Sequence, residues 1–391
     1  MTKAVNHSAR KHALLSASGA SRWLNCTPSA RLEEKFEDKT SVFAEEGTLA
    51  HEFSDIELRY KLGLISKKVY STEIAKLRKH ELYSVEMEPE VAKYVEIVME
   101  AYNAAKQKNP DAVILVEQRL DFSHLVEQGF GTGDCVIIAD GVLDVIDLKY
   151  GKGVKVDAEE NPQLKLYGSG ALREYELLYD IHTVRLTIVQ PRLDHVSSWE
   201  ISVDDLVAWG ENVVKPKALK AYAGEGEQNP GEWCKFCKAK AVCRGLANEN
   251  MKLAAFEFQD PHILSDKEIL EIYGQLPIFQ DWVNAVSSYM LDEAIKGKQW
   301  PGYKLVEGRS NRKWLDENKV IEILKKDYRE DEYMVSKLAG ISTIEKLVGK
   351  ANFGPKFNEF IVKPPGAPTL VPESDKRPAM GTEQAKLDFK D

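Results

Sequence analysis

The sequence predicts an α/β protein with a central mixed β-sheet flanked by helices. Two observations lead to this fold class. Three β-rich runs follow one another at 112–120, 133–139 and 142–149, and helix-like patterns precede and follow them in the chain. Helical and strand-like runs in this arrangement are typical of a sheet covered by helices. The chain has 391 residues, which suits one large domain with additions, or two to three domains.

The helices are predicted from their periodicity and their end signals. Asn161-Pro162 supplies an N-cap and a proline at the first helical position, and Asn109-Pro110 ends an earlier helix. Residues 302–314, rich in Gly and Arg, are expected to form a hairpin. The helices are expected at 21–36, 44–61, 89–108, 162–178, 203–223 and 266–297, with short helices up to about 361 and a further strand at 182–191.

The chain divides into four predicted parts. Residues 1–20 form a flexible leader, and residues 21–250 form the main domain, which contains the β-rich runs and a cysteine cluster. A mostly helical accessory region follows at 251–362. Residues 363–391 are rich in proline and polar residues, and we expect them to be a disordered tail because such a segment buries too little apolar surface to order itself.

Composition excludes some classes of protein and leaves others open. No run of about 18 apolar residues exists, so a membrane span is not expected. An odd count of five cysteines does not suit a secreted disulfide scaffold, and we therefore expect a cytoplasmic protein. The net charge of −9 repels DNA at long range, but a local basic track can still bind it, so the charge does not decide the partner.

The most informative motif is an acidic hairpin. Asp140-Gly141 between two β-rich runs predicts a two-residue turn, which places Asp134 opposite Asp147 with Cβ atoms about 4.5–5.5 Å apart. Both faces of the hairpin are largely apolar, as in a buried central pair of strands. Two buried, opposed carboxylates repel each other unless a cation lies between them, so this pattern predicts a divalent metal. Lys149 emerges on the same face. Solvated acids at a fraying hairpin end are the alternative.

Other polar residues could complete such a site. His51, within a predicted helix, could bind the metal through its imidazole. Glu117 on the preceding strand could add a carboxylate. Gln163 and Tyr167 are spaced i, i+4 on a helix, so they share a face and could hold phosphate oxygens. Each has an ordinary alternative: a surface or core histidine, an edge acid, and a polar helix stripe.

Four cysteines suit a second metal centre. Cys234, Cys237 and Cys243 are clustered, and Cys26 lies about two hundred residues upstream. Four thiolates are what a [4Fe–4S] cluster or a structural Zn²⁺ requires, and such a centre would tie distant parts of the chain together. The fifth, Cys135, alternates away from Asp134 and is expected in the core. Unliganded thiols are the alternative for the cluster.

These motifs, in this order, resemble the PD-(D/E)XK nuclease superfamily in its RecB-like branch. They are similar to the iron–sulfur exonucleases, such as the AddB nuclease domain and the CRISPR-adaptation nucleases, and to a phage-encoded group known only as a domain of unknown function. The resemblance covers about residues 15–250 and implies a restriction-endonuclease-like core. Many relatives have Glu where this chain has Asp147, and the shorter side chain can alter metal preference.

The resemblance implies a role for each motif. Asp134, Asp147 and Lys149 would be catalytic, with Lys149 orienting the attacking water or stabilising phosphate charge. Gln163 and Tyr167 would seat the DNA strand. The implied ligands of Mg²⁺ or Mn²⁺ are His51, Asp134, Asp147 and the Leu148 carbonyl. The implied ligands of a structural [4Fe–4S] cluster or Zn²⁺ are Cys26, Cys234, Cys237 and Cys243.

The expected function is a metal-dependent DNA exonuclease that processes ends in phage recombination or replication, beside a single-strand annealing or single-strand-binding protein. The alternatives are a non-catalytic DNA-binding or scaffold protein that keeps the fold, and a structure-selective endonuclease. Two further segments could contact partners. The first segment could be a basic DNA contact or a solvated hairpin, and its residues are Arg309, Arg312, Lys313 and Trp314. The second could be a sliding-clamp-binding peptide or a chance match, and its residues are Gln384, Leu387 and Phe389.

Overall fold

The computed structural model describes residues 13–37, 41–253, 264–308, 310–334, 338–364, 366–373, 375 and 377–381. The chain forms two compact units, Met1–Phe279 and Gln280–Asp391, and each is described by itself. Within the described ranges, no helix combines the length and the apolar character that crossing a membrane requires.

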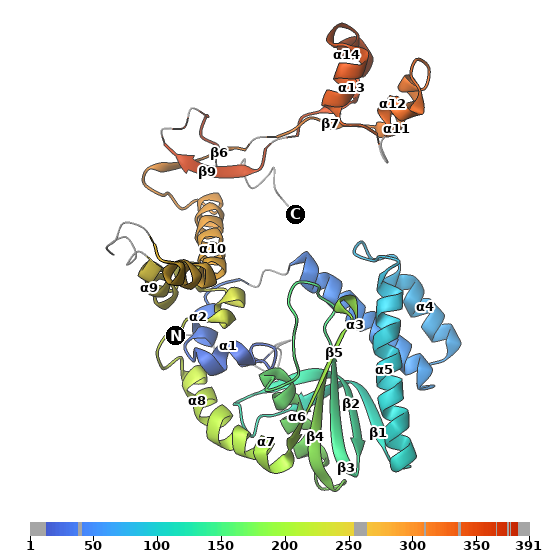
Figure 1. Ribbon diagram of the computed structural model, residues 1–391, viewed down its shortest axis with the longest axis vertical. Helices are drawn as coiled ribbons and strands as arrows, with labels where there is room; N and C mark the ends of the chain where they lie inside the picture. The colour runs from blue at the N-terminus through green and yellow to red at the C-terminus, as the bar shows by residue number, and fades with distance from the viewer. Residues whose placement is uncertain are drawn as a thin grey trace. The chain divides into compact units, whose positions relative to one another are not determined.

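The first unit is built on one five-stranded sheet, whose strands follow the chain order from β1 to β5 (Figure 1). Strand β3 pairs with β4 in parallel, and the other neighbours are antiparallel. The predicted α/β class with a central mixed sheet flanked by helices is confirmed. The strands are β1 Val113–Asp121, β2 Phe130–Ala139, β3 Gly141–Leu148, β4 Ile181–Gln190 and β5 His195–Ser202.

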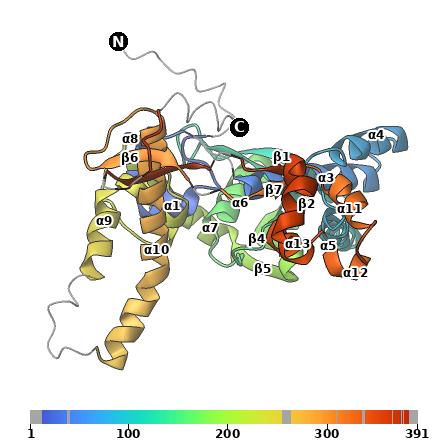
Figure 2. The ribbon, with the colours of Figure 1, turned by 90° about the horizontal axis from the view of Figure 1, so that it is seen from above.

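Helices cover both faces of this sheet, as Figures 1 and 2 show from two directions. On one face lie α3 Val42–Lys61, α4 Lys67–Leu77 and α5 Met87–Lys108. On the other face lie α1 Ala20–Asn25, α2 Ser29–Glu33, α6 Pro162–Tyr175, α7 Val203–Trp209 and α8 Lys215–Ala223. A π-helical turn at Gly210–Val214 joins α7 to α8, and α9 Arg244–Met251 follows.

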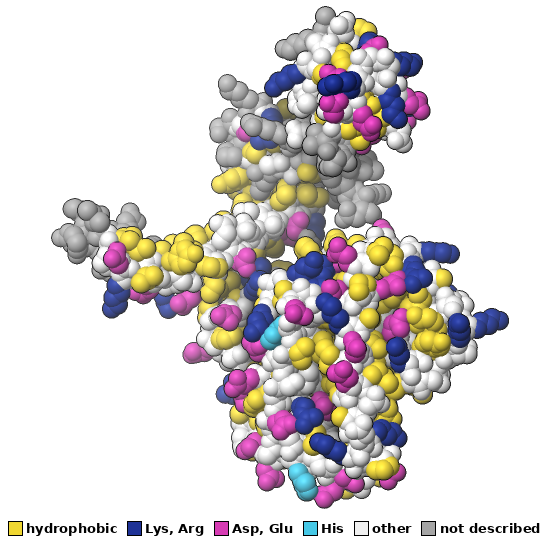
Figure 3. Space-filling view, turned by 45° about the vertical axis from the view of Figure 1, so that its right-hand side comes forward, with side chains coloured by type: hydrophobic (Ala, Val, Ile, Leu, Met, Phe, Trp, Pro, Cys, Tyr) yellow, Lys and Arg dark blue, Asp and Glu magenta, His cyan; other side chains and the backbone are white. Residues whose placement is uncertain are grey.

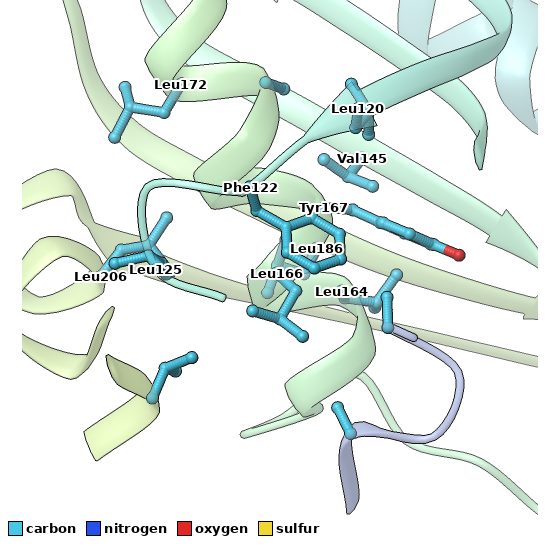
Figure 4. Close-up of a cluster of buried hydrophobic side chains, with 14 of the residues drawn as sticks. Leu120, Phe122, Leu125, Val145, Leu164, Leu166, Tyr167, Leu172, Leu186 and Leu206 are labelled. Carbon is cyan, nitrogen blue, oxygen red and sulfur yellow. The ribbon is translucent and has the colours of Figure 1, made fainter. Parts of the chain in front are cut away.

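The β2–β3 hairpin has the predicted register. Ala139 pairs with Val142 and Cys135 with Ile146, and Gly141 adopts a φ of +88° in the turn. Its side chains alternate between two hydrophobic cores. Val136 packs under α6, whereas Cys135 packs under α5 and is fully buried. Figure 4 shows the core under α6, in which the Tyr167 hydroxyl points away from the leucine side chains.

The start of α6 is also as predicted. The Asn161 side chain accepts hydrogen bonds from the backbone N–H groups of Gln163 (3.1 Å) and Leu164 (3.2 Å), and Pro162 occupies the first helical position. This cap satisfies two of the N–H groups that a helix start leaves without partners. It fixes the first turn of α6, which carries Gln163.

Some local structure differs from the prediction. The leader is not wholly flexible, because Leu15 and Ala17 are buried in the core under α6 and the Trp23 indole donates a hydrogen bond to the Ser16 carbonyl (2.9 Å). The prediction of a flexible segment up to residue 20 is therefore wrong from residue 15 on, while residues 1–12 lie outside the described residues. The sequence analysis also missed α4 and β5.

The second unit has short helices around a core of its own. That core includes Val320, Leu324, Tyr333, Ile344 and Phe357. Helix α10 Asp266–Ile295 contains the boundary between the units. The remaining elements are β6 Tyr303–Glu307, β7 Lys313–Trp314, α11 Glu317–Leu324, α12 Glu330–Tyr333, α13 Ile341–Val348, α14 Lys350–Phe357, β8 Ile361–Val362 and β9 Pro368–Pro372.

Two predictions for this unit need correction. The hairpin expected at 302–314 does not form, because β6 pairs with β9 and β7 pairs with β8. Strand β9 also lies within the segment that was expected to be a disordered tail, where its pairing with β6 supplies the backbone hydrogen bonds that order it. Local sequence patterns cannot reveal strand partners that lie so far apart in the chain.

Candidate functional site

Two buried aspartates lie at one end of the hairpin. Asp134 on β2 and Asp147 on β3 are 7% and 2% exposed. Asp134 Oδ2 accepts a hydrogen bond from the Leu148 backbone N–H (2.7 Å). Burial opposes ionisation of Asp134, but His51 and the Leu148 N–H hold its pKa below its usual value. Burial raises the pKa of Asp147, and Lys149 offsets only part of that effect.

His51 reaches the first aspartate from α3. Its Nδ1 lies 3.1 Å from Asp134 Oδ1. Burial would lower the pKa of His51, but the facing carboxylate outweighs burial and raises it to about 9. Helix α3 is fixed on both sides of His51. Glu46 pairs with Arg192 after β4 (3.0 Å), and Arg59 donates to the Val116 carbonyl of β1 (3.3 Å).

Glu117 joins this pair through an unusual backbone conformation. It has a φ of +51° in the middle of β1, at the position between the pairs Val116–Cys135 and Gln118–Gly133 and thus beside Asp134. A non-glycine residue in this region costs roughly 1–2 kcal/mol. The alternation of side chains between the two faces of the strand changes at this residue. Val116 and Leu120 would share a face in a regular strand, but Val116 packs on the α5 side and Leu120 on the α6 side.

The three side chains form a compact group of metal-ligand type. One ligand atom each from His51, Glu117 and Asp134 lies within 4.8 Å of the others. Burial and the neighbouring Asp134 raise the pKa of Glu117 to about 7, which means that negative charge is crowded here. An imidazole with two carboxylates suits Mn²⁺ and, through its oxygens, Mg²⁺. The donor set therefore fits the divalent ion that the sequence predicted.

The second aspartate belongs to a hydrogen-bonded group of its own. Lys149 Nζ lies 2.8 Å from Asp147 Oδ2 and donates to Gln163 Oε1 (3.0 Å). Gln163 Nε2 in turn donates to Asp147 Oδ1 and to the Tyr167 hydroxyl, both at 3.3 Å. Burial would lower the pKa of Lys149, but Asp147 and Asp134 raise it above its usual value, so its ammonium stays charged.

A glycine lets Tyr167 lie close to the sheet. A Cβ atom added at Gly131 of β2 would stand 2.6 Å from the Tyr167 ring, so a larger residue would displace the ring. The structure thus brings Asp147, Lys149, Gln163 and Tyr167 together. Their spacing had predicted the pairs Asp147–Lys149 and Gln163–Tyr167, and only the resemblance implied that the two pairs meet.

The sequence analysis gave some site residues too little weight or missed them. Glu117 was considered only as an additional carboxylate, and its positive φ has no signal in the sequence. Tyr94 of α5 was missed. It is fully buried, and its hydroxyl donates a long hydrogen bond to the Ile146 carbonyl (3.5 Å) beneath the site. A tyrosine at helical spacing is ordinarily a core residue, so only tertiary structure reveals its position.

The four clustered cysteines line one cavity of about 20 Å³ together with Arg22 and Trp233. Burial raises the pKa of Cys237 to about 12, with a further contribution from Glu33. The Glu33 carboxylate accepts a hydrogen bond from the Lys238 N–H (2.8 Å) and pairs with Arg22 (2.8 Å). A nearby positive charge such as a metal ion would favour the ionised form of Cys237, and a set of four thiols suits a soft metal centre. The four cysteines are Cys26, Cys234, Cys237 and Cys243.

The DNA contact predicted at residues 309–314 receives little support from the structure. The Trp314 ring packs against Phe353 and Phe357, so base stacking by this residue has no support. Arg312 pairs with Glu345 (3.1 Å). Lys313 is exposed on β7. Arg309 and the clamp-peptide residues Gln384, Leu387 and Phe389 lie outside the described residues.

These features define an α/β protein with a buried imidazole–carboxylate group and a lysine–carboxylate group at one end of a mixed sheet. The chain belongs to the family described as "Protein of unknown function (DUF2800)", whose signature matches residues 12–378. The sequence had indicated a resemblance to a domain-of-unknown-function group. The more specific resemblance to RecB-like nucleases is not tested by this match.

Two solved structures are similar to parts of the chain. One is a candidate exonuclease from Eubacterium rectale, with 15% identity over 60% of this chain and 90% of that protein, at a TM-score of 0.33. The other is the protein SSO0001, with 15% identity over 56% of this chain and 94% of that protein, at a TM-score of 0.22. TM-scores of this size carry no weight for fold or function, so the function must be argued from the site.

Proposed function

We propose that this protein is a metal-dependent deoxyribonuclease of the PD-(D/E)XK superfamily, in its RecB-like branch, and that it acts as an exonuclease at DNA ends. One observation carries the proposal. His51, Glu117 and Asp134 offer ligand atoms within 4.8 Å of one another, and on the neighbouring strand the Lys149 ammonium lies 2.8 Å from the Asp147 carboxylate. In metal-assisted phosphodiester hydrolysis, ligands bind a cation and a fixed positive group beside it stabilises developing negative charge.

The residues have distinct roles in this proposal. His51, Glu117 and Asp134 would hold Mg²⁺ or Mn²⁺, with Asp147 and the Leu148 carbonyl as further ligands. The bound ion would lower the pKa of a water molecule and neutralise charge on the scissile phosphate. Lys149, held by Asp147 and Gln163, orients the water or stabilises the developing phosphate charge. Gln163 and Tyr167 seat the DNA strand.

The four cysteines are proposed to bind a structural [4Fe–4S] cluster, with structural Zn²⁺ as the alternative. Their convergence from α1 and from residues 234–243 into one cavity supports a shared metal centre. Such a centre would tie the N-terminal helices to the segment after α8 and so stabilise the domain between them. The visible spectrum of anaerobically purified protein distinguishes the two metals, because only the cluster absorbs there.

The biological setting is also a proposal. Phage recombination or replication would supply DNA ends, and a single-strand annealing or single-strand-binding protein would act on the strands that the enzyme exposes. The sliding-clamp contact through the C-terminal peptide and the cytoplasmic location stay predictions.

A cleavage assay tests the proposed function. Full-length protein is incubated with linear and with circular DNA in Mg²⁺ or Mn²⁺, beside an Asp147→Ala variant. Release of nucleotides from linear DNA alone, lost in the variant, supports the exonuclease. Nicking of circles would favour a structure-selective endonuclease instead. If neither DNA is cut under any of these conditions, a non-catalytic DNA-binding or scaffold protein becomes the better account.

A further inference from the structure

The loop that follows Lys149 has a pattern that the proposed catalytic groups do not use. It reads Gly151-Lys152-Gly153-Val154-Lys155, and all five residues are exposed. Among the described residues, none of its backbone N–H groups has a hydrogen-bond acceptor. Lys152 has no ion-pair partner there either, and Lys155 has only Asp157, at 3.5 Å. Free N–H groups beside lysines are the usual elements of an anion-binding loop.

Both ends of this loop are anchored, although its middle is free. Tyr150, at the start, is buried beneath the Arg192 guanidinium, which lies 4.6 Å from the ring centre. At the other end, the buried Gln190 side chain donates to the Val154 carbonyl (2.9 Å) and accepts from the Val156 N–H (2.7 Å). A loop held in this way presents its N–H groups without a large loss of conformational freedom on binding.

The two glycines are not required by the fold. Neither Gly151 nor Gly153 adopts a positive φ, and a Cβ atom at either position would meet no described atom within 4 Å. Neither backbone strain nor packing within the described chain therefore calls for glycine. A remaining physical reason is that another molecule must approach the backbone closely at this point.

We propose that this loop, residues 151–155, binds a backbone phosphate of a nucleic-acid strand next to the bond being cleaved; the assignment rests on the proposed function. Gly151 follows Lys149 by two residues, so its N–H lies within about 7 Å of the Lys149 backbone. The backbone N–H groups hold the phosphate oxygens, and Lys152 supplies the compensating charge. Basic and acidic side chains are intermixed on the face shown in Figure 3, which presents no broad basic surface.

DNA binding by full-length protein tests this, with fluorescence anisotropy in EDTA so that cleavage does not interfere. The Gly151→Ala/Gly153→Ala variant should melt like the wild type yet bind a labelled duplex roughly tenfold more weakly. Lys152→Ala should weaken binding to a similar degree and lower the slope of log affinity against log salt by about 0.9, whereas the glycine variant should leave that slope unchanged. Gly274→Ala and Lys79→Ala are matched controls, since Gly274 also has open space and Lys79 is exposed.

The outcomes separate the loop from the chemistry. Wild-type affinity and salt slope in both loop variants would overturn the loop assignment, even if the protein cleaves DNA. Failure of the wild type to bind DNA would overturn it as well. Binding that depends on the loop, in a protein that cleaves no DNA with either metal, would uphold the loop and reject the proposed hydrolysis.

Discussion

The two aspartates of the site stand on neighbouring strands, but they belong to different chemical surroundings. Asp134 faces an imidazole and a second carboxylate, that of Glu117, within the compact group. Asp147 instead has the Lys149 ammonium at 2.8 Å and the Gln163 amide at 3.3 Å. The first half gathers ligand atoms and carries its positive charge as a proton on His51, which a metal ion can replace, whereas the second half contains a lysine ammonium.

This difference shows how one site can separate metal binding from the placement of a fixed positive charge. The Asp134 half gains most from an added divalent ion, because burial makes its crowded negative charge costly without one. The Asp147 half fixes a positive group beside that ion. The opposite pKa directions of the two aspartates, lowered for Asp134 and raised for Asp147, reflect these surroundings.

Asp134→Asn should have the largest effect. The substitution keeps the shape of the side chain and an acceptor for the Leu148 N–H, but it removes the charge that binds the ion. We expect Mn²⁺ binding to be lost in calorimetry and cleavage of linear DNA to fall on the order of 10⁴-fold. Tight Mn²⁺ binding by this variant would remove the distinction between the two halves.

Lys149→Met should affect chemistry without affecting the metal. Loss of one fixed charge beside the reacting phosphate typically costs about 10²- to 10³-fold in rate. Because the substitution leaves Asp147 buried without its partner, the Asp147→Asn/Lys149→Met double variant provides a better-folded comparison. We expect Lys149→Met to retain Mn²⁺ binding, measured by calorimetry, whereas the double variant, which also loses the Asp147 carboxylate, should bind Mn²⁺ more weakly. DNA cleavage should fall in both proteins. Unchanged cleavage would show that Lys149 serves only to neutralise Asp147.

A third buried aspartate gives a matched control for both halves. Asp144 lies on the same strand as Asp147. Its Oδ1 has no hydrogen-bond partner among the described residues, and its Oδ2 pairs with Arg185 (3.4 Å). Burial outweighs this pairing and raises the pKa of Asp144 to about 6. A raised carboxyl pKa means that ionisation destabilises the folded state above pH 6, and this cost disappears as the pH falls from 6 towards the unfolded value.

Asp144→Asn removes that cost. We therefore expect the variant to be about 2 kcal/mol more stable than the wild type at pH 8, with the difference shrinking as the pH falls below about 6. Urea unfolding at several pH values measures this. Metal binding and cleavage should not change. Equal stability of the two proteins at pH 8 would show that the pairing with Arg185 fully offsets the cost of burying the ionised Asp144.

Tyr167→Phe should have the smallest effect. It removes one neutral hydrogen bond, that from Gln163, so the KM for DNA should rise roughly threefold with kcat nearly unchanged. Tyr175→Phe on the same helix is the control, because the Tyr175 hydroxyl donates to the neighbouring Glu174 (3.0 Å) and not to a residue of the site. A large loss of kcat in Tyr167→Phe alone would give the hydroxyl a role in the reaction itself.

The sequence predicted those parts of the site that depend on local rules. The Asp140-Gly141 turn fixes the hairpin register, and strand parity then places Lys149 beside Asp147. Helical spacing similarly places Gln163 beside Tyr167. Glu117 could not be weighted correctly, because its position depends on a positive φ that only the folded surroundings impose.

Long-range pairing accounts for the other failures. Strand β9 pairs with β6 across more than sixty residues, and neither segment carries a turn signal that names its partner. Leu15 and Ala17 are buried because α1 and α6 provide a surface for them, although the leader itself has no apolar periodicity. Burial of such short segments is a property of the assembled domain.

The position of a bound Mn²⁺ tests the central claim most directly. Crystals of the full-length protein soaked in Mn²⁺ should show one anomalous peak in contact with His51, Glu117 and Asp134, and the peak should vanish in Asp134→Asn but persist in Asp144→Asn. Crystals saturated with Mn²⁺ that show no peak at these three side chains would contradict the metal site and, with it, the proposed hydrolysis.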